Sequence, residues 1–269
     1  MNPIARDTHA ERPVRPLGIL AAVSAELEGL LALIGETRIE RIGMRDYYIG
    51  RLGDRPCVAV LARIGKVAAA VSAVTLIREF NADTLLFTGL AGGVGPEVNV
   101  GDVVIATHLV QHDMDASPLF ARHEIPLLGR KTFAADDDWN QCLTDCTRAY
   151  FEHDMRGDID AATQTHFNLV RPTVHHGLIA SGDQFINNQH EAQTLLNELP
   201  GLLCIEMEGA AVAQVCHEYN VRLAVIRTIS DRADASADTD FIDFLERVAS
   251  RYCAGIFSRV AQSLAASND

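Results

Sequence analysis

The sequence has no excess of positive charge and no cluster of basic residues. Its 269 residues include 23 Lys and Arg against 36 Asp and Glu, and the formal net charge is −13 at pH 7. Nucleic acids and anionic membranes both bind proteins through Lys and Arg, so this composition argues against either partner. A small molecule or another protein is the expected partner.

Long apolar segments are also missing. No apolar run approaches the roughly 18 residues that a membrane-spanning helix requires. Residues 1–16 read MNPIARDTHAERPVRP, which is polar and basic and lacks the apolar centre of a signal peptide. We therefore expect no membrane association, a frayed N-terminal tail over residues 1–16, and a single domain over residues 17–269.

The 6 cysteines contain no CxxC pair, and several of them lie in apolar runs. A buried thiol behaves as a small apolar side chain, and free thiols fit a reducing compartment, so we expect a cytoplasmic protein. Cys142 and Cys146 would share a helix face, which is weak support for a metal. His112, Asp113 and Asp115 are metal-binding residue types, but no partner His follows at helical spacing. The sequence therefore predicts no metal and no cofactor.

Apolar runs of strand length alternate with helical patterns along the chain. The expected strands are residues 17–23, 47–52, 58–64, 84–87, 101–106, 177–181, 202–205 and 223–229. The expected helices are residues 24–34, 67–80, 139–151, 208–217 and 239–265. Residues 88–93, TGLAGG, should form a turn, and residues 152–175 an exposed excursion. This alternation predicts a three-layer α/β/α sandwich with a central mixed β-sheet.

Three carboxylates stand where an expected strand ends. Glu26 falls in the first helical turn after residues 17–23, with Ser24 as the expected N-cap; Glu208 and Asp231 follow two later apolar runs. Ligands collect outside the carboxyl ends of strands in open α/β sheets, so these acids are the first candidates for chemistry. The alternative is that each acid only stabilises a helix N-terminus. Spacing alone leaves both interpretations open.

Acids without a reactive Ser–His pair or a metal cluster suggest acid–base cleavage of a ring-bearing substrate. Splitting a bond to the anomeric carbon of a sugar fits, because its transition state is positive and oxocarbenium-like. One acid protonates the leaving group and another activates water. The segment GDQFIN, residues 182–187, frames Phe185 and Ile186 with turn formers and suits stacking on a flat ring.

Seven segments together resemble a known family. They are AAVSAELE (21–28), RIGKVAAA (63–70), TGLAGG (88–93), VGDVV (100–104), SGDQFIN (181–187), IEMEGAAVAQVCH (205–217) and RTISDRAD (227–234). In this order they resemble the 5′-methylthioadenosine/S-adenosylhomocysteine nucleosidases of the purine nucleoside phosphorylase superfamily. The resemblance covers most of residues 17–265. It implies a nucleoside phosphorylase-like fold, hydrolysis of an adenine nucleoside without a cofactor, and a homodimer.

The same resemblance implies roles for individual residues. Glu26 matches the acid that activates the water attacking C1′, Glu208 the acid that holds the ribose hydroxyls, and Asp231 the acid that protonates adenine N7. The implied substrate-binding residues are Val23, Ile64, Leu90, Ala91, Gly92, Phe185, Ile186, Glu206, Met207, Arg227, Ser230 and Phe241. Phe120, in a Pro-containing apolar loop, is the implied contribution of a partner subunit.

Three departures from the family leave the preferred 5′-substituent open. Leu90 stands where many members carry a small polar residue, Val23 replaces a common methionine, and the segment around residues 152–175 has no counterpart in the shorter members. 6-Amino-6-deoxyfutalosine or another adenosine derivative remains an alternative substrate. A phosphate-dependent phosphorylase is a second alternative, but an acid follows the first strand where phosphate would bind. A non-catalytic nucleoside-binding protein is a third, against which the retention of all three acids argues.

Overall fold

Ten strands form one mixed sheet in the computed structural model, which describes residues 14–266. The strands are β1 (Leu17–Ala21), β2 (Gly35–Ile42), β3 (Arg45–Leu52), β4 (Arg55–Leu61), β5 (Thr84–Gly93), β6 (Val103–Gln111), β7 (Thr132–Ala134), β8 (Val174–Ser181), β9 (Leu202–Glu206) and β10 (Arg222–Asp231). Most of the expected N-terminal tail, residues 1–16, lies outside the described residues.

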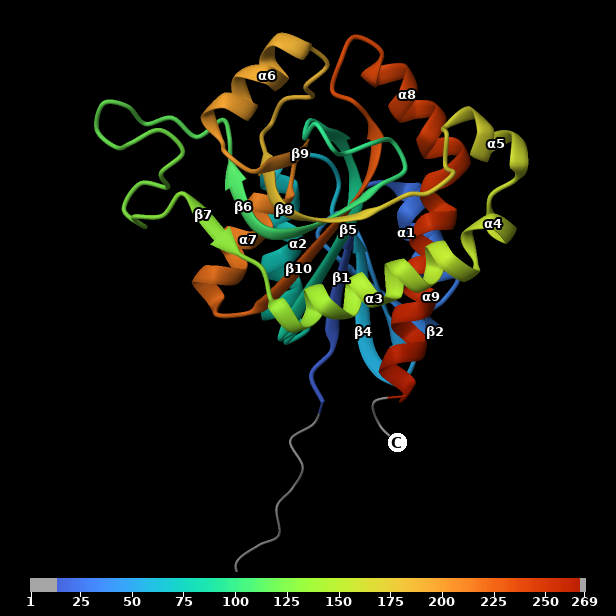
Figure 1. Ribbon diagram of the computed structural model, residues 1–269. Coiled ribbons are helices and arrows are strands. Elements are labelled where there is room, and N and C mark those ends of the chain that lie inside the picture. Colours follow the sequence, from blue (N-terminus) through green and yellow to red (C-terminus); the bar gives the residue numbers. More distant parts are fainter. Residues whose placement is uncertain (1–13, 267–269) are drawn as a thin grey trace, which may run out of the picture.

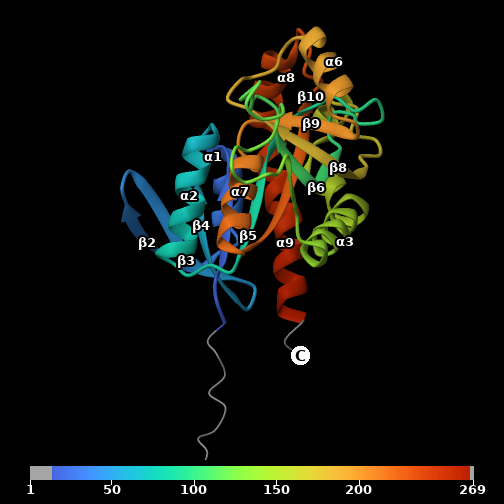
Figure 2. The same cartoon turned by 90° about the vertical axis from the view of Figure 1, so that its left-hand side faces the viewer.

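Helices cover both faces of this sheet (Figures 1 and 2). They are α1 (Ser24–Leu31), α2 (Lys66–Arg78), α3 (Asp137–His153), α4 (Met155–Asp158), α5 (Ala161–His166), α6 (Gln189–Glu198), α7 (Gly209–Tyr219), α8 (Ala237–Phe244) and α9 (Ser250–Ala266), with a π-helical turn at Leu245–Ala249. One core packs under α1, α3 and α9, and a second packs under α2 and α7. The expected mixed α/β fold with a central sheet is confirmed.

Part of the sheet closes on itself. β5 pairs with β10 and β9, β10 pairs with β6, and β8 joins β6 to β9. We call these five strands the strand ring. The remaining strands, β1, β4, β3 and β2, extend the sheet from β5, and β2 is the last strand of that side. The strand ring brings chain segments from residues 84 to 231 around one end of the molecule.

The expected glycine turn at residues 88–93 is wrong, because these residues continue β5 to Gly93. The glycines there make room for side chains of neighbouring strands. A Cβ at Gly89 would lie 2.9 Å from the guanidinium carbon of Arg227, and a Cβ at Gly92 would lie 2.9 Å from Oδ1 of Asp231. A strand without side chains at these positions lets two buried polar groups approach its backbone.

The expected exposed excursion over residues 152–175 is only partly correct, because many of its residues are exposed but one side is buried. It contains α4 and α5, and four of its apolar residues are buried in the core under α3 and α9. Those residues are Met155, Ile159, Phe167 and Leu169. The Phe167 ring lies 5.1 Å from the Phe244 ring in an edge-on arrangement. The polar residues between these four positions hide the pattern, because the two helices are too short to repeat it.

The first helix begins differently from the expectation. Val23, not Ser24, occupies the N-cap position of α1. The Glu26 side chain folds back, and its Oε2 accepts hydrogen bonds from the backbone N–H groups of Ala22 at 3.1 Å and Val23 at 3.2 Å. Glu26 therefore satisfies N–H groups that the start of a helix leaves unpaired.

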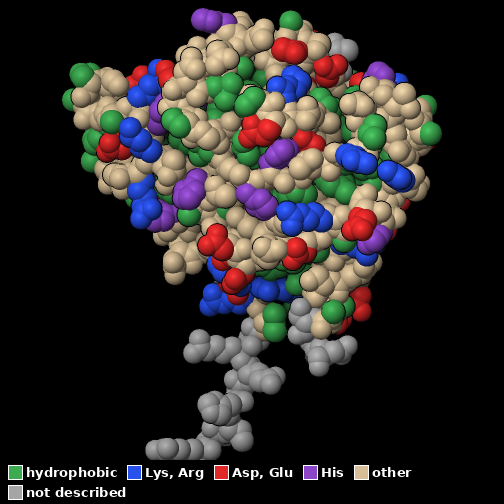
Figure 3. All heavy atoms as spheres, viewed as in Figure 1, with side chains coloured by type: hydrophobic (Ala, Val, Ile, Leu, Met, Phe, Trp, Pro, Cys, Tyr) green, Lys and Arg blue, Asp and Glu red, His purple; other side chains and the backbone are tan. Residues whose placement is uncertain are grey.

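The surface carries no continuous basic area on the face shown in Figure 3, where Lys and Arg side chains are scattered among acidic, His and hydrophobic ones. Within residues 14–266, no helix is long and apolar enough to cross a membrane.

Candidate active site

One cavity opens where several strands end. Its wall is built from segments that finish or directly follow β1, β4, β5, β8, β9 and β10. The lining residues are Ala22, Val23, Ile64, Leu90, Ala91, Gly92, Gln184, Phe185, Ile186, Ile205, Glu206, Met207, Glu208, Asp231, Ala233 and Phe241. Twelve residues that the sequence singled out thus meet in one place. Strand ends are where an α/β sheet gathers its ligand-binding groups.

Four expected residues do not line this cavity. Glu26, Arg227 and Ser230 lie behind its wall, bonded to residues that form it. Phe120 lies in the segment between β6 and β7 and is also absent from the wall.

Four lining residues were not expected: Ala22, Gln184, Ile205 and Ala233. Each falls inside a segment that carries the resemblance and adjoins or lies close to an expected residue. Three are small or aliphatic and contribute only shape, so no residue type marked them in the sequence.

Asp231 ends β10 and is held in a fixed orientation. Its Oδ2 accepts a hydrogen bond from Ser230 Oγ at 2.8 Å, and its Oδ1 accepts one from the Ala233 N–H at 2.9 Å. The side chain is only 2% exposed. Burial raises its pKa above the usual value, although the two hydrogen bonds act in the opposite direction. Asp231 is therefore an acid that retains its proton more readily than an exposed aspartate.

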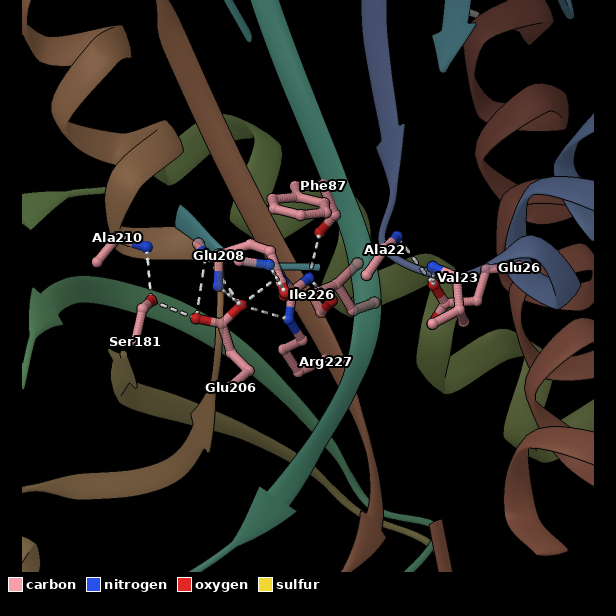
Figure 4. Close-up of polar contacts among 12 residues, drawn as sticks. Ala22, Val23, Glu26, Phe87, Ser181, Glu206, Glu208, Ala210, Ile226 and Arg227 are labelled. Atoms are coloured by element: carbon pink, nitrogen blue, oxygen red, sulfur yellow. Dashed lines mark hydrogen bonds and ion pairs between the residues drawn. The ribbon is translucent and has the colours of Figure 1, made fainter. Parts of the chain in front are cut away.

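Glu206 and Arg227 form a buried ion pair beside the cavity (Figure 4). Arg227 Nη2 lies 2.6 Å and Nε 3.2 Å from Oε2 of Glu206, and the guanidinium stacks 4.2 Å from the centre of the Phe87 ring. The Glu206 carboxylate also accepts bonds from Ser181 Oγ and from the N–H groups of Glu208 and Gly209. With so many donors, the pair is a fixed part of the framework and not a free ligand group.

Arg227 stays charged in this setting. Burial would lower its pKa, but the nearby carboxylates of Glu206, Glu208 and Glu26 outweigh burial and raise it. A permanent cation with no exposed surface thus sits among three acids. It favours the ionised forms of Glu26 and Glu208.

Glu208 sits at the N-cap position of α7, with its side chain 4% exposed and lining the cavity. Its Oε1 accepts a hydrogen bond from the Gly65 N–H at 2.9 Å. Burial, and then the charge of Glu206, raise its pKa to about 8, while Arg227 and Gly65 act against that rise. The protonation of Glu208 therefore depends on its burial and on the charges of Glu206 and Arg227 together.

Glu26 is 2% exposed, and its carboxylate is turned toward the backbone of Ala22 and Val23, which form part of the wall (Figure 4). Burial raises its pKa to about 7, and Arg227 and the two N–H groups oppose the rise. The charge of Glu26 also acts on Glu208. Glu26 therefore caps the start of α1, as the helix-stabilising alternative expects, but it is buried and lies directly behind the cavity wall.

Two aromatic side chains, Phe185 and Phe241, also line the cavity. The Phe185 and Phe241 rings lie 6.0 Å apart at 75°. Phe185 is 42% exposed, whereas Ile186 beside it is buried. A flat ligand that entered between this loop and the strand ends would cover the exposed part of Phe185.

Buried acids and aromatic side chains thus line one cavity at the strand ends. Comparison with known sequences shows which class of protein has this arrangement. The family model described as the phosphorylase superfamily matches residues 16–261, so the chain belongs to that superfamily. Within it, the chain belongs to the family of 5′-methylthioadenosine/S-adenosylhomocysteine nucleosidases. It is an enzyme of the N-glycosidic-bond hydrolase class.

Curated relatives support the family membership over most of their length. The nucleosidase of Anoxybacillus flavithermus is 32% identical over 234 residues, which cover 87% of this chain and 92% of the relative. The nucleosidase of Actinobacillus succinogenes is 31% identical over 247 residues, which cover 91% of this chain and 98% of the relative.

Solved structures of related proteins share the fold. The nucleosidase of Neisseria meningitidis in complex with methylthio-immucillin-A is 30% identical with a TM-score of 0.79, covering 94% of this chain and 99% of that chain. The native futalosine hydrolase of Helicobacter pylori is 28% identical with a TM-score of 0.78, covering 93% of this chain and 98% of that chain.

Proposed function

We propose that this enzyme hydrolyses the N-glycosidic bond of 5′-substituted adenosines, with 5′-methylthioadenosine and S-adenosylhomocysteine as its first substrates. The products are adenine and the corresponding thioribose. The observation that carries the proposal is the meeting of Glu208 and Asp231 on one cavity, with Glu26 directly behind its wall. The names of the related nucleosidases supply the substrate class.

Asp231 acts at the base in this proposal. A carboxyl group whose pKa is raised by burial donates a proton or a strong hydrogen bond to adenine N7 as the bond to the sugar breaks. The hydrogen bonds from Ser230 and Ala233 hold it in place for that step. Protonation at N7 makes adenine a better leaving group, because the electron pair of the breaking bond neutralises the protonated ring and adenine leaves as a neutral molecule instead of an anion.

Glu26 activates the attacking water. With a pKa of about 7, a substantial fraction of its side chains is ionised at neutral pH and accepts the proton of a water. The carboxylate must turn from the N–H groups of Ala22 and Val23 to reach a water inside the cavity. Its negative charge also stabilises the positive charge that develops on the ribose ring.

Glu208 holds the ribose. One oxygen of its carboxyl group is bonded to the Gly65 N–H, which leaves the other to hydrogen-bond the ribose hydroxyls, as an acceptor when Glu208 is ionised and as a donor when it is protonated. Met207, next in the chain, packs against the sugar. Substrate binding thereby brings the ribose hydroxyls close to a carboxylate that is already oriented.

The loop after β8 and the end of α8 bind the rest of the nucleoside. Phe185 stacks on adenine, the Ile186 backbone reads the edge of the base, and Val23, Ile64 and Phe241 surround the 5′-substituent. The 5′-group itself stays open between methylthio, homocysteinyl and larger groups. The futalosine hydrolase of similar structure makes a futalosine-type substrate the main alternative.

A homodimer belongs to the same proposal, with Phe120 completing the 5′ pocket of the partner. Ile64 lines the cavity yet is 61% exposed, and Val67 nearby on α2 is 75% exposed. In the segment that carries Phe120, Leu119 and Leu127 are 84% and 93% exposed. Such apolar exposure near a binding site favours cover by a second subunit. Sedimentation of the purified protein tests this part.

A panel of 5′-modified adenosines, each incubated with the enzyme with and without phosphate, tests the function. We expect adenine release that does not depend on phosphate, and the ranking of the panel identifies the 5′-group. Strict dependence on phosphate with ribose 1-phosphate as product would show a phosphorylase instead. Tight binding of the nucleosides without release of base would show a binding protein.

A further inference from the structure

Asp113 lies outside the cavity, but its carboxylate joins two segments that form the cavity wall. We propose that Asp113 is a positioning residue for nucleoside binding, acting through a ring of contacts with Lys66 and Asp183. The inference rests on the proposed function, because it assigns a task to the same site. It also accounts for an acid whose residue type and neighbours suggest only a metal ligand.

Three contacts close this Lys66–Asp113–Asp183 ring. Lys66 Nζ lies 2.6 Å from Oδ1 of Asp113, and the Asp183 N–H donates to Oδ2 of Asp113 at 2.9 Å. The Lys66 N–H donates to Oδ1 of Asp183 at 2.8 Å. Each of the three residues thus contacts both others, although residues 66, 113 and 183 come from segments far apart in the chain.

The ring is charged but only partly shielded, because Asp113 and Asp183 are exposed residues. The side chains of Lys66 and Asp113 are 16% and 30% exposed. Burial would raise the pKa of Asp113, but the hydrogen bonds from Lys66 and Asp183 outweigh it and hold the pKa below the usual value. A charged hydrogen bond in such a partly buried place is stronger than an ion pair on open surface.

On one side, the ring places the group that orients the ribose acid. Gly65 directly precedes Lys66, and its N–H donates to Oε1 of Glu208 at 2.9 Å. Gly65 has a φ of +98°, which favours glycine, and a Cβ there would lie 3.2 Å from Oδ1 of Asp183. The position of the Lys66 backbone therefore sets the position of the Gly65 N–H against Glu208.

On the other side, the ring places the loop at the base end. Asp183 directly precedes Gln184, Phe185 and Ile186, all of which line the cavity. The ring therefore fixes the distance between the ribose end and the base end of the site.

A further pair of hydrogen bonds ties the ring to a helix. Lys66 Nζ also lies 3.2 Å from Oε1 of Gln111, and Gln111 Nε2 donates to Oε1 of Gln214 on α7 at 2.8 Å. Because α7 begins directly after Glu208, these hydrogen bonds connect the Lys66 ammonium group to the helix whose N-cap is the ribose acid. Lys66 and Asp113 are thus expected to work as one unit.

Without the ring, the loop and Gly65 would move independently. Aligning them would then reduce the free energy of nucleoside binding. Binding should weaken more than the chemical step slows, because none of the three residues touches the reacting atoms in the proposed mechanism. The matched variants are Asp113→Asn, Lys66→Met and the double variant. Asp115→Asn is the control, since the exposed Asp115 side chain bonds Ser117 and neither Lys66 nor Asp183.

We expect Asp113→Asn and Lys66→Met each to raise KM by about tenfold, the effect of losing roughly one charged hydrogen bond, with a smaller change in kcat. The double variant should be no worse than either single one, because paired residues show non-additive effects. The Kd of a non-hydrolysable adenosine analogue, measured by calorimetry, should rise with KM. Asp115→Asn should leave both constants unchanged.

Two results would overturn the proposal: unchanged KM and Kd in both single variants, or a fall in the thermal midpoint without a change in Kd. Multiplicative effects in the double variant would also count against a shared ring. The Kd separates this inference from the proposed function. If the wild-type protein binds the analogue but releases no adenine from nucleosides, the hydrolase proposal is refuted. The Kd values of the variants would still decide the role of the ring.

Discussion

Replacing Asp231 with Asn tests the base end of the site most directly, because it removes an acidic proton and keeps the size of the side chain. The bond from the Ala233 N–H to Oδ1, 2.9 Å long, is available to an amide oxygen as well. Ser230 Oγ, which donates to Asp231 at 2.8 Å, lies 3.4 Å from the Ala91 carbonyl oxygen. A hydroxyl both donates and accepts, so Ser230 is able to donate to Ala91 and accept from the new amide. We therefore expect the amide side chain of this variant to fit without loss of the fold.

The expected loss of activity follows from the size of general acid catalysis. A positioned acid contributes typically about 10²- to 10⁴-fold, which corresponds to roughly 2.7–5.5 kcal/mol in the barrier. Asp231→Asn should lower kcat/KM for adenine release by at least about 10²-fold. Steady-state assays of adenine release, with near-UV circular dichroism and the thermal midpoint as checks of folding, measure it.

Asp234→Asn is the matched control for this experiment. Asp234 lies three residues further on, is not part of the cavity wall, and its Oδ1 accepts bonds from the N–H and the hydroxyl of Ser236. Its kcat/KM should stay close to that of the unchanged enzyme. A folded Asp231→Asn protein that keeps nearly full activity would refute the assignment of the base acid.

Three further predictions concern the buried groups around the cavity. Because burial raises the pKa of Glu26 from 4.5 to about 7, kcat/KM should fall as the pH drops below neutrality. The stability that protonated Glu26 contributes is lost as the pH rises through about 7. The thermal midpoint of Glu26→Gln should therefore exceed that of the wild-type protein most at alkaline pH. Arg227→Met leaves a buried carboxylate without its cation and should cost about 3–5 kcal/mol in urea unfolding, whereas a cost near zero would contradict the framework role. Gly92→Ala would place a Cβ 2.9 Å from Oδ1 of Asp231 and should lower kcat/KM, while Gly157→Ala, with nothing within 4 Å, should not.

The sequence predicts the membership of the cavity better than the state of each acid. Glu208 and Asp231 could be expected to meet because both end apolar runs, and strand ends gather at one side of a sheet. Both line the cavity. The orientation of Glu26 could not be predicted, because it depends on hydrogen bonds to Ala22 and Val23 that compete with the cavity for one side chain.

Features that depend on contacts between residues distant in the sequence could not be predicted either. The glycines of residues 88–93 read as a turn because the side chains that need their space, Arg227 and Asp231, come much later in the chain. The strand β2 has no clear sequence signal because it is an edge strand with charged residues at half of its positions and a largely exposed surface. The contacts of Asp113 depend on the first residue of α2 and on the loop after β8, and they leave no local pattern.

The strand ring also determines when a nascent chain acquires its site. β5 ends at Gly93, but its neighbours β9 and β10 begin only at Leu202 and Arg222. Until the ribosome has released those strands, one edge of β5 exposes unpaired N–H and C=O groups, the kind of edge that associates with other chains. Premature termination before Arg222 would leave both an open edge and no Asp231, so unfinished chains should be insoluble as well as inactive.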